Sequence, residues 1–87
     1  MITKATSYTD LVQLVAEVFM IDASKLNPRS TANDVPGWDS VSQVMLLMRI
    51  EDKFGIELDI NKLSVASDLQ ALADIIYETK ASSAGLS

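Results

Sequence analysis

Residues 40–55 read SVSQVMLLMRIEDKFG and carry the most informative helical pattern in this chain of 87 residues. At 100° per residue, one arc of the helix holds four apolar side chains, those of Leu46, Leu47, Ile50 and Phe54. A separate arc holds four more, those of Val41, Val44, Met45 and Met48. Gly55 is a good residue to end such a helix. The pattern therefore predicts a helix from Ser40 to Phe54 with two distinct apolar faces.

Two explanations account for the second apolar face. A helix at the centre of a small bundle can pack against neighbours on both sides. Alternatively, the Leu46 face packs in the core and the Val41 face is offered to a partner protein. Methionine favours the second explanation, because its flexible thioether is frequent on surfaces that accept several partners. The exposure of Val44 and Met48 distinguishes the two.

Upstream of this segment, the pattern predicts one further helix and a long loop. The helix is expected to open at Ser7, with Asp10 in an imperfect capping box, and to end near Met20. Its apolar side holds Tyr8, Leu11, Leu14, Val15, Val18 and Phe19. Residues 21–38 then lose the helical period and contain several turn signals. A loop of this length needs apolar anchors, and the candidates are Leu26, Val35 and Trp38.

Downstream, a single helical turn is expected around Asp59–Leu63, followed by a last helix. That helix is expected to start at Ser67, where Gln70 completes an S-x-x-Q capping box, and to fade near Thr79. Strand alternation is absent. The sequence thus predicts an all-α protein, a small three-to-four-helix bundle with a long loop between the first and second helices. We expect a single domain over residues 1–87, ordered from about 7 to 79, with a flexible tail over 80–87.

Composition excludes several classes of function. Histidine and cysteine are both absent, which removes the usual bases and nucleophiles of catalysis, disulfides and thiolate zinc sites. The net charge of −5 disfavours nucleic-acid binding. No signal peptide is apparent and no apolar run is long enough to span a membrane. We therefore expect a cytoplasmic, monomeric protein that is not an enzyme and holds no metal ion.

Ser40, at the start of the central helix, has two possible roles. It could be the N-cap, with Gln43 completing a capping box. It could also carry a phosphate group, because a helix N-terminus presents N–H groups and a positive dipole end to an anion. On spacing alone the first role is favoured, and both remain open.

The residues flanking this helix resemble a known family. Gly37-Trp38-Asp39-Ser40-Val41 at its start, and Glu51-Asp52-Lys53-Phe54-Gly55-Ile56-Glu57-Leu58 at its end, are similar to the acyl carrier proteins. In that family an Asp-Ser-Leu motif opens the second helix and a Phe-Gly-Ile run ends it. The resemblance extends from about Ser7 to Tyr77, and the combination of both ends with the helix lengths makes it specific.

The resemblance implies a role for each matching residue. Ser40 would carry a covalent 4′-phosphopantetheine arm, donated by coenzyme A through a phosphopantetheinyl transferase, and Asp39 would help that transferase and its metal to engage. Leu46 and Ile50 would face the interior, where some members shelter an acyl chain. Partner enzymes would dock on the second helix, at Val44, Met48, Glu51 and Asp52 and on the adjoining Val41 and Met45. Those enzymes would be loading ligases for acyl or aminoacyl groups, synthases and off-loading enzymes.

Three departures from the family pattern bear on the pathway. Val41 replaces the usual leucine, Met45 stands where many fatty-acid carriers have glutamate, and residues 40–54 hold two acidic and two basic side chains. This less acidic helix favours a specialised pathway, such as polyketide, nonribosomal peptide or other secondary-metabolite biosynthesis, over general fatty-acid biosynthesis. The alternative function is an unmodified helical module that binds a partner through Val41, Val44, Met45 and Met48.

Overall fold

The computed structural model describes residues 3–85, and all regular structure in that range is helical. It contains four α-helices and two short 3₁₀ helices, and both 3₁₀ helices lie between the first and second α-helices. Their bounds are α1 Lys4–Phe19, η1 Ala23–Lys25, η2 Ala32–Asp34, α2 Ser40–Phe54, α3 Ile60–Val65 and α4 Leu69–Gly85. The expected all-α bundle, with its long connection between the first two main helices, is confirmed.

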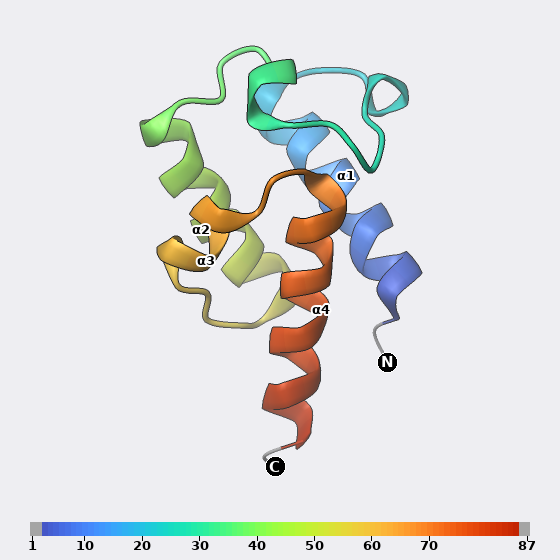
Figure 1. Ribbon diagram of the computed structural model, residues 1–87, viewed down its shortest axis with the longest axis vertical. Helices are drawn as coiled ribbons and strands as arrows, with labels where there is room; N and C mark the ends of the chain where they lie inside the picture. Colours follow the sequence, from blue (N-terminus) through green and yellow to red (C-terminus); the bar gives the residue numbers. More distant parts are fainter. Residues whose placement is uncertain (1–2, 86–87) are drawn as a thin grey trace.

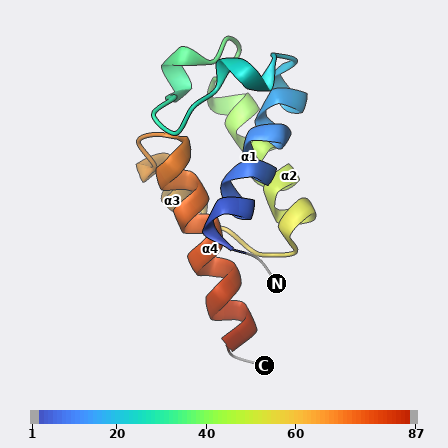
Figure 2. The same ribbon diagram turned by 90° about the vertical axis from the view of Figure 1, so that its right-hand side faces the viewer.

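The three long helices form the bundle, and the loop from α1 to α2 closes one end of it (Figure 1). Helix α1 packs against both α4 and α2, while the short α3 packs against α2. The last turns of α4 project beyond the other helices at the opposite end, as Figure 2 also shows. The start of α2 therefore lies at the loop-covered end, away from the end of α4.

The core lies where α1, α2 and α4 face one another. Leu11, Leu46, Ile50 and Ile76 are fully buried there. The expected core face of α2 is largely confirmed, because Leu46, Ile50 and Phe54 are buried and Leu47 is partly buried against them. Burying such side chains removes apolar surface from water, which is the main stabilising contribution in a domain of this size.

Helix α1 begins earlier than the sequence suggested, at Lys4. Thr3 is the N-cap, and its hydroxyl and that of Thr6 form a reciprocal capping box. The expected start at Ser7, with Asp10 in the box, is wrong because Ser7 is fully buried and its hydroxyl donates to the carbonyl of Ala73 in α4 at 3.0 Å. The predicted end is confirmed, since Met20 is the C-cap.

The loop between α1 and α2 is held down by the anchors expected from sequence. Val35 is buried, and Leu26 and Trp38 pack partly buried against the core. The Trp38 ring stacks on Phe19 with centroids 5.1 Å apart and planes 15° from parallel. Two backbone hydrogen bonds, from Leu69 and Gln70 to carbonyls of residues 30 and 28, join the loop to the start of α4.

Helix α4 differs from the prediction at both ends. Asp68 supplies the cap, since its Oδ1 accepts from the Ala71 N–H at 2.8 Å, so the expected capping box on Ser67 is wrong. The helix also continues past Thr79 to Gly85. Lys80 shows one reason, because its Nζ donates to the Phe54 carbonyl at 2.9 Å and so gives this part of α4 a contact with the end of α2. Of the expected tail, residues 86–87 lie outside the described range.

Candidate functional site

The first turn of α2 presents Ser40 to solvent. Ser40 is the first residue of the helix and is exposed, and its hydroxyl forms no hydrogen bond within residues 3–85. The capping role belongs to its neighbour, because Asp39 Oδ1 accepts from the Ser42 N–H at 2.8 Å and the Asp39 carbonyl accepts from the Gln43 N–H at 2.8 Å. The interpretation of Ser40 as the N-cap is therefore wrong, and its hydroxyl is left available for chemistry.

Asp39 is an ionised side chain beside that hydroxyl. The hydrogen bonds that its carboxylate accepts from Ser42, the backbone N–H first, hold the pKa of Asp39 below its ordinary value. Hydrogen bonds to the charged form of an acid favour that form. At neutral pH the start of α2 therefore combines a free hydroxyl, a helix N-terminus and one exposed carboxylate.

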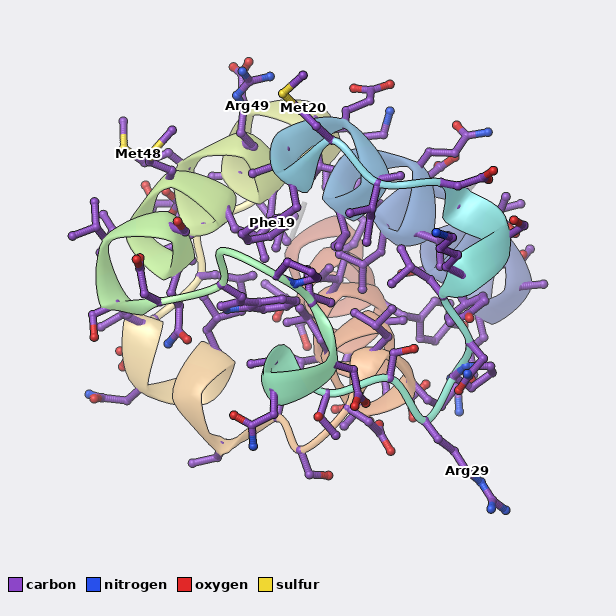
Figure 3. The ribbon with its side chains drawn as sticks, turned by 90° about the horizontal axis from the view of Figure 1, so that it is seen from above. Phe19, Met20, Arg29, Met48 and Arg49 are labelled. Atoms are coloured by element: carbon purple, nitrogen blue, oxygen red, sulfur yellow. The ribbon has the colours of Figure 1, made fainter. Side chains whose placement is uncertain are left out.

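The residues before α2 aim this turn outward. Gly37 has φ of +87°, a conformation that side-chain-bearing residues rarely adopt, and it turns the chain after the buried Val35. Trp38 then anchors the chain on Phe19, whose side chain points into the molecule in Figure 3. With Val35 and Trp38 fastened to the body of the protein, Asp39 and Ser40 are held at its rim.

The second apolar face of α2 is exposed beside Ser40. Val44 is 43% exposed and Met48 64% exposed, and Val41 and Met45 are exposed as well. These values decide between the two explanations given above, because a helix packed on both sides would bury Val44 and Met48. We call Val41, Val44, Met45 and Met48 the α2 apolar face.

Charged residues flank this face, and they are not equivalent. Asp52 is exposed, and with Met45, Met48 and Arg49 it lines a shallow hollow on α2. Glu51 is only partly exposed, and its Oε2 accepts from the Leu58 N–H at 3.0 Å. Of the two acids expected to meet partners, Glu51 thus also has a structural task, since it holds the connection between α2 and α3.

Two residues that the sequence interpretation left out also lie at the surface. Met20 is 90% exposed and, among the described residues, is the one non-glycine residue with positive φ, at 55°. Arg49 projects outward on the same side of the molecule as Met20 and Met48 (Figure 3). Arg49 belongs to neither apolar arc of residues 40–55, which places it away from the core, whereas the sequence signal at Met20 is the lack of a glycine where α1 ends.

Comparison with known proteins identifies the family. The family model for the phosphopantetheine attachment site matches residues 9–76, which is most of the chain. The chain belongs to the acyl carrier protein family. Proteins of this family are carriers and not enzymes, which agrees with the expectation drawn from the lack of histidine and cysteine.

Similar proteins agree with this assignment. Acyl carrier proteins of two Helicobacter pylori strains, G27 and HPAG1, are each 33% identical to the chain over 51 residues. That match covers 59% of this chain and 65% of each relative, so the chain spans slightly less than two thirds of their length. The solution structure of holo acyl carrier protein from Geobacter metallireducens superposes with a TM-score of 0.79 at 25% identity, over 91% of both chains.

The cofactor of this family, and of this chain, is covalent 4′-phosphopantetheine. The described residues fit such a group, because attachment needs an accessible hydroxyl and the negatively charged phosphate of the arm needs a favourable electrostatic field. The start of α2 provides both, an unpaired hydroxyl on Ser40 and a helix N-terminus.

Elsewhere in the part of the chain that the structure describes, no cluster of three or more acidic side chains is arranged to hold a metal ion, and no helix has the length and apolarity to cross a membrane.

Proposed function

We propose that this chain carries an acyl or aminoacyl group as a thioester on a 4′-phosphopantetheine arm attached to Ser40. The single observation that carries the proposal is the exposed Ser40 hydroxyl at the first position of α2. This hydroxyl does not cap the helix, because Asp39 is the N-cap. When bound, the arm supplies the terminal thiol that this cysteine-free chain lacks. The chain's own residues hold the attachment point at the rim of the bundle.

Asp39 has two tasks in this proposal. Its carboxylate orders the first turn of α2 by accepting the Ser42 N–H, which keeps the Ser40 hydroxyl in place. Its remaining oxygen and its negative charge face solvent beside that hydroxyl, where they suit a divalent cation brought by the phosphopantetheinyl transferase. Hard cations such as Mg²⁺ prefer carboxylate oxygens.

The α2 apolar face is the proposed docking surface for partner enzymes. Two acids lie at its border, Asp52 and Glu51, and Glu51 also accepts a hydrogen bond from the Leu58 N–H. Weak, reversible contacts suit a carrier that must leave one enzyme for the next. The tether then compensates for the weak contacts, because it raises the effective concentration of the cargo at each docked enzyme. We expect loading ligases, synthases and off-loading enzymes as partners, and a monomer that works in the cytoplasm.

The charge of α2 supports a specialised pathway. Arg49 and Lys53 balance Glu51 and Asp52, so the helix that meets partners has no net charge. A neutral, methionine-rich helix selects partner surfaces that are less basic than an acidic helix would select. We therefore propose a carrier of secondary-metabolite biosynthesis, of the polyketide or nonribosomal type, and not one of general fatty-acid synthesis.

Incubation with coenzyme A and a broad-specificity phosphopantetheinyl transferase tests the proposal. Intact mass spectrometry is expected to show the addition of one phosphopantetheine to the wild-type chain and to Ser42→Ala, and none to Ser40→Ala. Ser42 is the matched control, a serine one turn or less away. Ser40→Ala should also unfold within about 0.5 kcal/mol of wild type, because Ser40 neither caps the helix nor is buried. Absence of any mass gain in the wild type would favour the unmodified interaction module instead.

A further inference from the structure

Met20 ends α1 in a strained conformation and holds its side chain in solvent. Its φ of 55° and ψ of 47° are left-handed, and the Ile21 N–H fixes this turn by donating to the Ala16 carbonyl at 3.0 Å. Glycine adopts such a conformation without strain, whereas methionine does not. The side chain is 90% exposed, so packing within the fold offsets little of the strain. A strained residue that the fold does not explain points to a function outside the fold.

The end of α1 is fastened to the residues that precede α2. Phe19, the neighbour of Met20, stacks on Trp38 with ring centroids 5.1 Å apart, and Trp38 precedes Ser40 by two residues. Helix α1 also packs against α2. Met20 is thus held at the end of the bundle that presents Ser40, and an enzyme that reaches Ser40 comes close to Met20.

Arg49 adds a positive charge to this side of the molecule. In the view of Figure 3 its side chain lies between those of Met48 and Met20. The guanidinium is exposed and forms no ion pair within residues 3–85, not even with Asp52, which lines the same hollow on α2. Its charge is therefore open to a partner.

The position of Arg49 determines which charge a partner must bring. An enzyme that covers Met20 and Met48 removes water from the guanidinium that lies between them in this view. A desolvated charge without a counter-charge is strongly unfavourable, whereas a carboxylate satisfies a guanidinium with two parallel hydrogen bonds. A lysine or arginine of the enzyme at the same place would be repelled.

We propose that Met20, Met48 and Arg49 form one docking surface across α1 and α2, and that it fits a cargo-handling enzyme with an apolar patch and a carboxylate opposite Arg49. The inference rests on the proposed carrier function and adds two features to it. The docking surface extends beyond the α2 apolar face onto α1. The partner presents an acidic group, where an acidic carrier helix would select a basic one.

Two synthetic helical peptides are the probes that test this surface. Both carry the same row of leucines, and the residues that flank the row are all glutamate in one peptide and all lysine in the other. The chain has four methionines, so isotope labelling of their methyl groups gives four NMR signals, of which those of Met20, Met45 and Met48 report on the surface. The arm-bearing protein, verified by intact mass, is titrated with each peptide. The glutamate peptide is expected to shift the Met20 and Met48 signals together, with one dissociation constant.

Arg49→Gln and Lys53→Gln are a matched pair, because each removes one positive charge from an exposed residue of α2. Arg49→Gln should weaken binding of the glutamate peptide by roughly tenfold. Lys53→Gln changes the net charge of the chain equally but lies outside the proposed surface, so its effect should stay below about twofold.

Met20→Gln tests the contribution of α1, because glutamine is of similar length to methionine but polar. It should weaken binding of the glutamate peptide by roughly three- to tenfold. Val65→Gln is its control, an exposed apolar residue on α3 that should leave binding unchanged. Circular dichroism checks the fold of each variant, and the wild-type titration decides the question even if a variant fails to fold.

Three results would overturn this inference. A lysine peptide that shifts the same signals at lower concentration than the glutamate peptide would assign the surface to a basic partner. A Met20 signal that the glutamate peptide leaves in place would exclude α1 from the surface. Met20 and Met48 signals that change with protein concentration, without any peptide, would assign the surface to a second copy of the chain. A failure of the carrier function is recognised separately, because the mass spectrum then shows no gain before any peptide is added.

Discussion

At the scale of the residue, the site depends on how Asp39 and Ser40 divide two tasks. Both are good N-cap residues, and spacing alone could not tell which of them closes the helix. The structure gives the cap to Asp39 and leaves Ser40 one position inside the helix. The exposed hydroxyl beside a capping carboxylate is the arrangement on which the proposed attachment depends.

The lowered pKa of Asp39 predicts a pH dependence of stability. Its ordinary value is 3.8 and its folded value lies below that. An acid whose pKa falls on folding stabilises the folded state above its unfolded pKa, and this stabilisation is lost as the pH falls through the folded pKa. Wild type should therefore lose stability below about pH 4 relative to Asp39→Asn, which keeps an N-cap oxygen but does not titrate. Urea unfolding at a series of pH values from about 2 to about 7 measures this loss. If the free energy of unfolding had the same pH dependence in the two proteins, the prediction would be contradicted.

Met20 offers a second test at a single residue. Its left-handed backbone conformation is unfavourable for a residue with a side chain, and 90% of that side chain is in solvent. Met20→Gly should therefore stabilise the fold, by up to about 1 kcal/mol in the free energy of unfolding. Met48→Gly is the control, because the same exposed residue inside a helix should cost about 1 kcal/mol. A loss of stability in Met20→Gly would show that its side chain makes a stabilising contact.

At the scale of the element, α2 is organised as two faces with different tasks. The buried face holds Leu46 and Ile50, whereas the α2 apolar face is left in solvent. Both faces could be read from the sequence, because the helical period places each residue on one side or the other. Periodicity could not decide which face meets the core. That depends on where α1 and α4 pack, and these are contacts between segments far apart in the chain.

The α2 apolar face predicts a selective effect on docking. Met48→Glu should lower kcat/KM for transfer of phosphopantetheine by roughly tenfold, because it places a charge where an apolar contact is needed. The thermal midpoint should change little, since Met48 is 64% exposed. Val65→Glu is the matched control, an exposed apolar residue on α3 that should leave the transfer rate unchanged. Equal losses in both variants would indicate a general effect of charge and no specific face.

At the scale of the whole molecule, α1 and α4 hold the bundle together while α2 displays the site. Sequence patterns predicted the helices, the loop and its anchors, but they misplaced the start of α1 and both ends of α4. The two starts carry local signals that the prediction passed over, the Thr3–Thr6 capping box and the Asp68 cap. The extension of α4 past Thr79 has a different cause. Lys80 donates to the Phe54 carbonyl at the end of α2, and a partner so far away along the chain leaves no local signal in the sequence.

The bond between Ser7 and Ala73 predicts a measurable contribution to the stability of the bundle. Ser7→Ala removes the hydroxyl that joins α1 to α4 and should lower the free energy of unfolding by about 0.5–1.5 kcal/mol. Thr9→Ala is the control, because the Thr9 hydroxyl bonds only within α1, to the Ala5 carbonyl, and is exposed. Chemical denaturation of both variants makes the comparison. A cost for Ser7→Ala no greater than that for Thr9→Ala would contradict the proposed tie between the helices.

The most direct test of the account asks which atom of the wild-type chain receives the arm. Cleavage after arginine releases the peptide of residues 30–49, which contains Ser30, Thr31, Ser40 and Ser42. After incubation with coenzyme A and the transferase, fragmentation of this peptide by mass spectrometry localises the added group. We predict one phosphopantetheine, wholly on Ser40. A group found on Ser42 or Ser30, or spread over several hydroxyls, would contradict the claim that the fold presents this one serine.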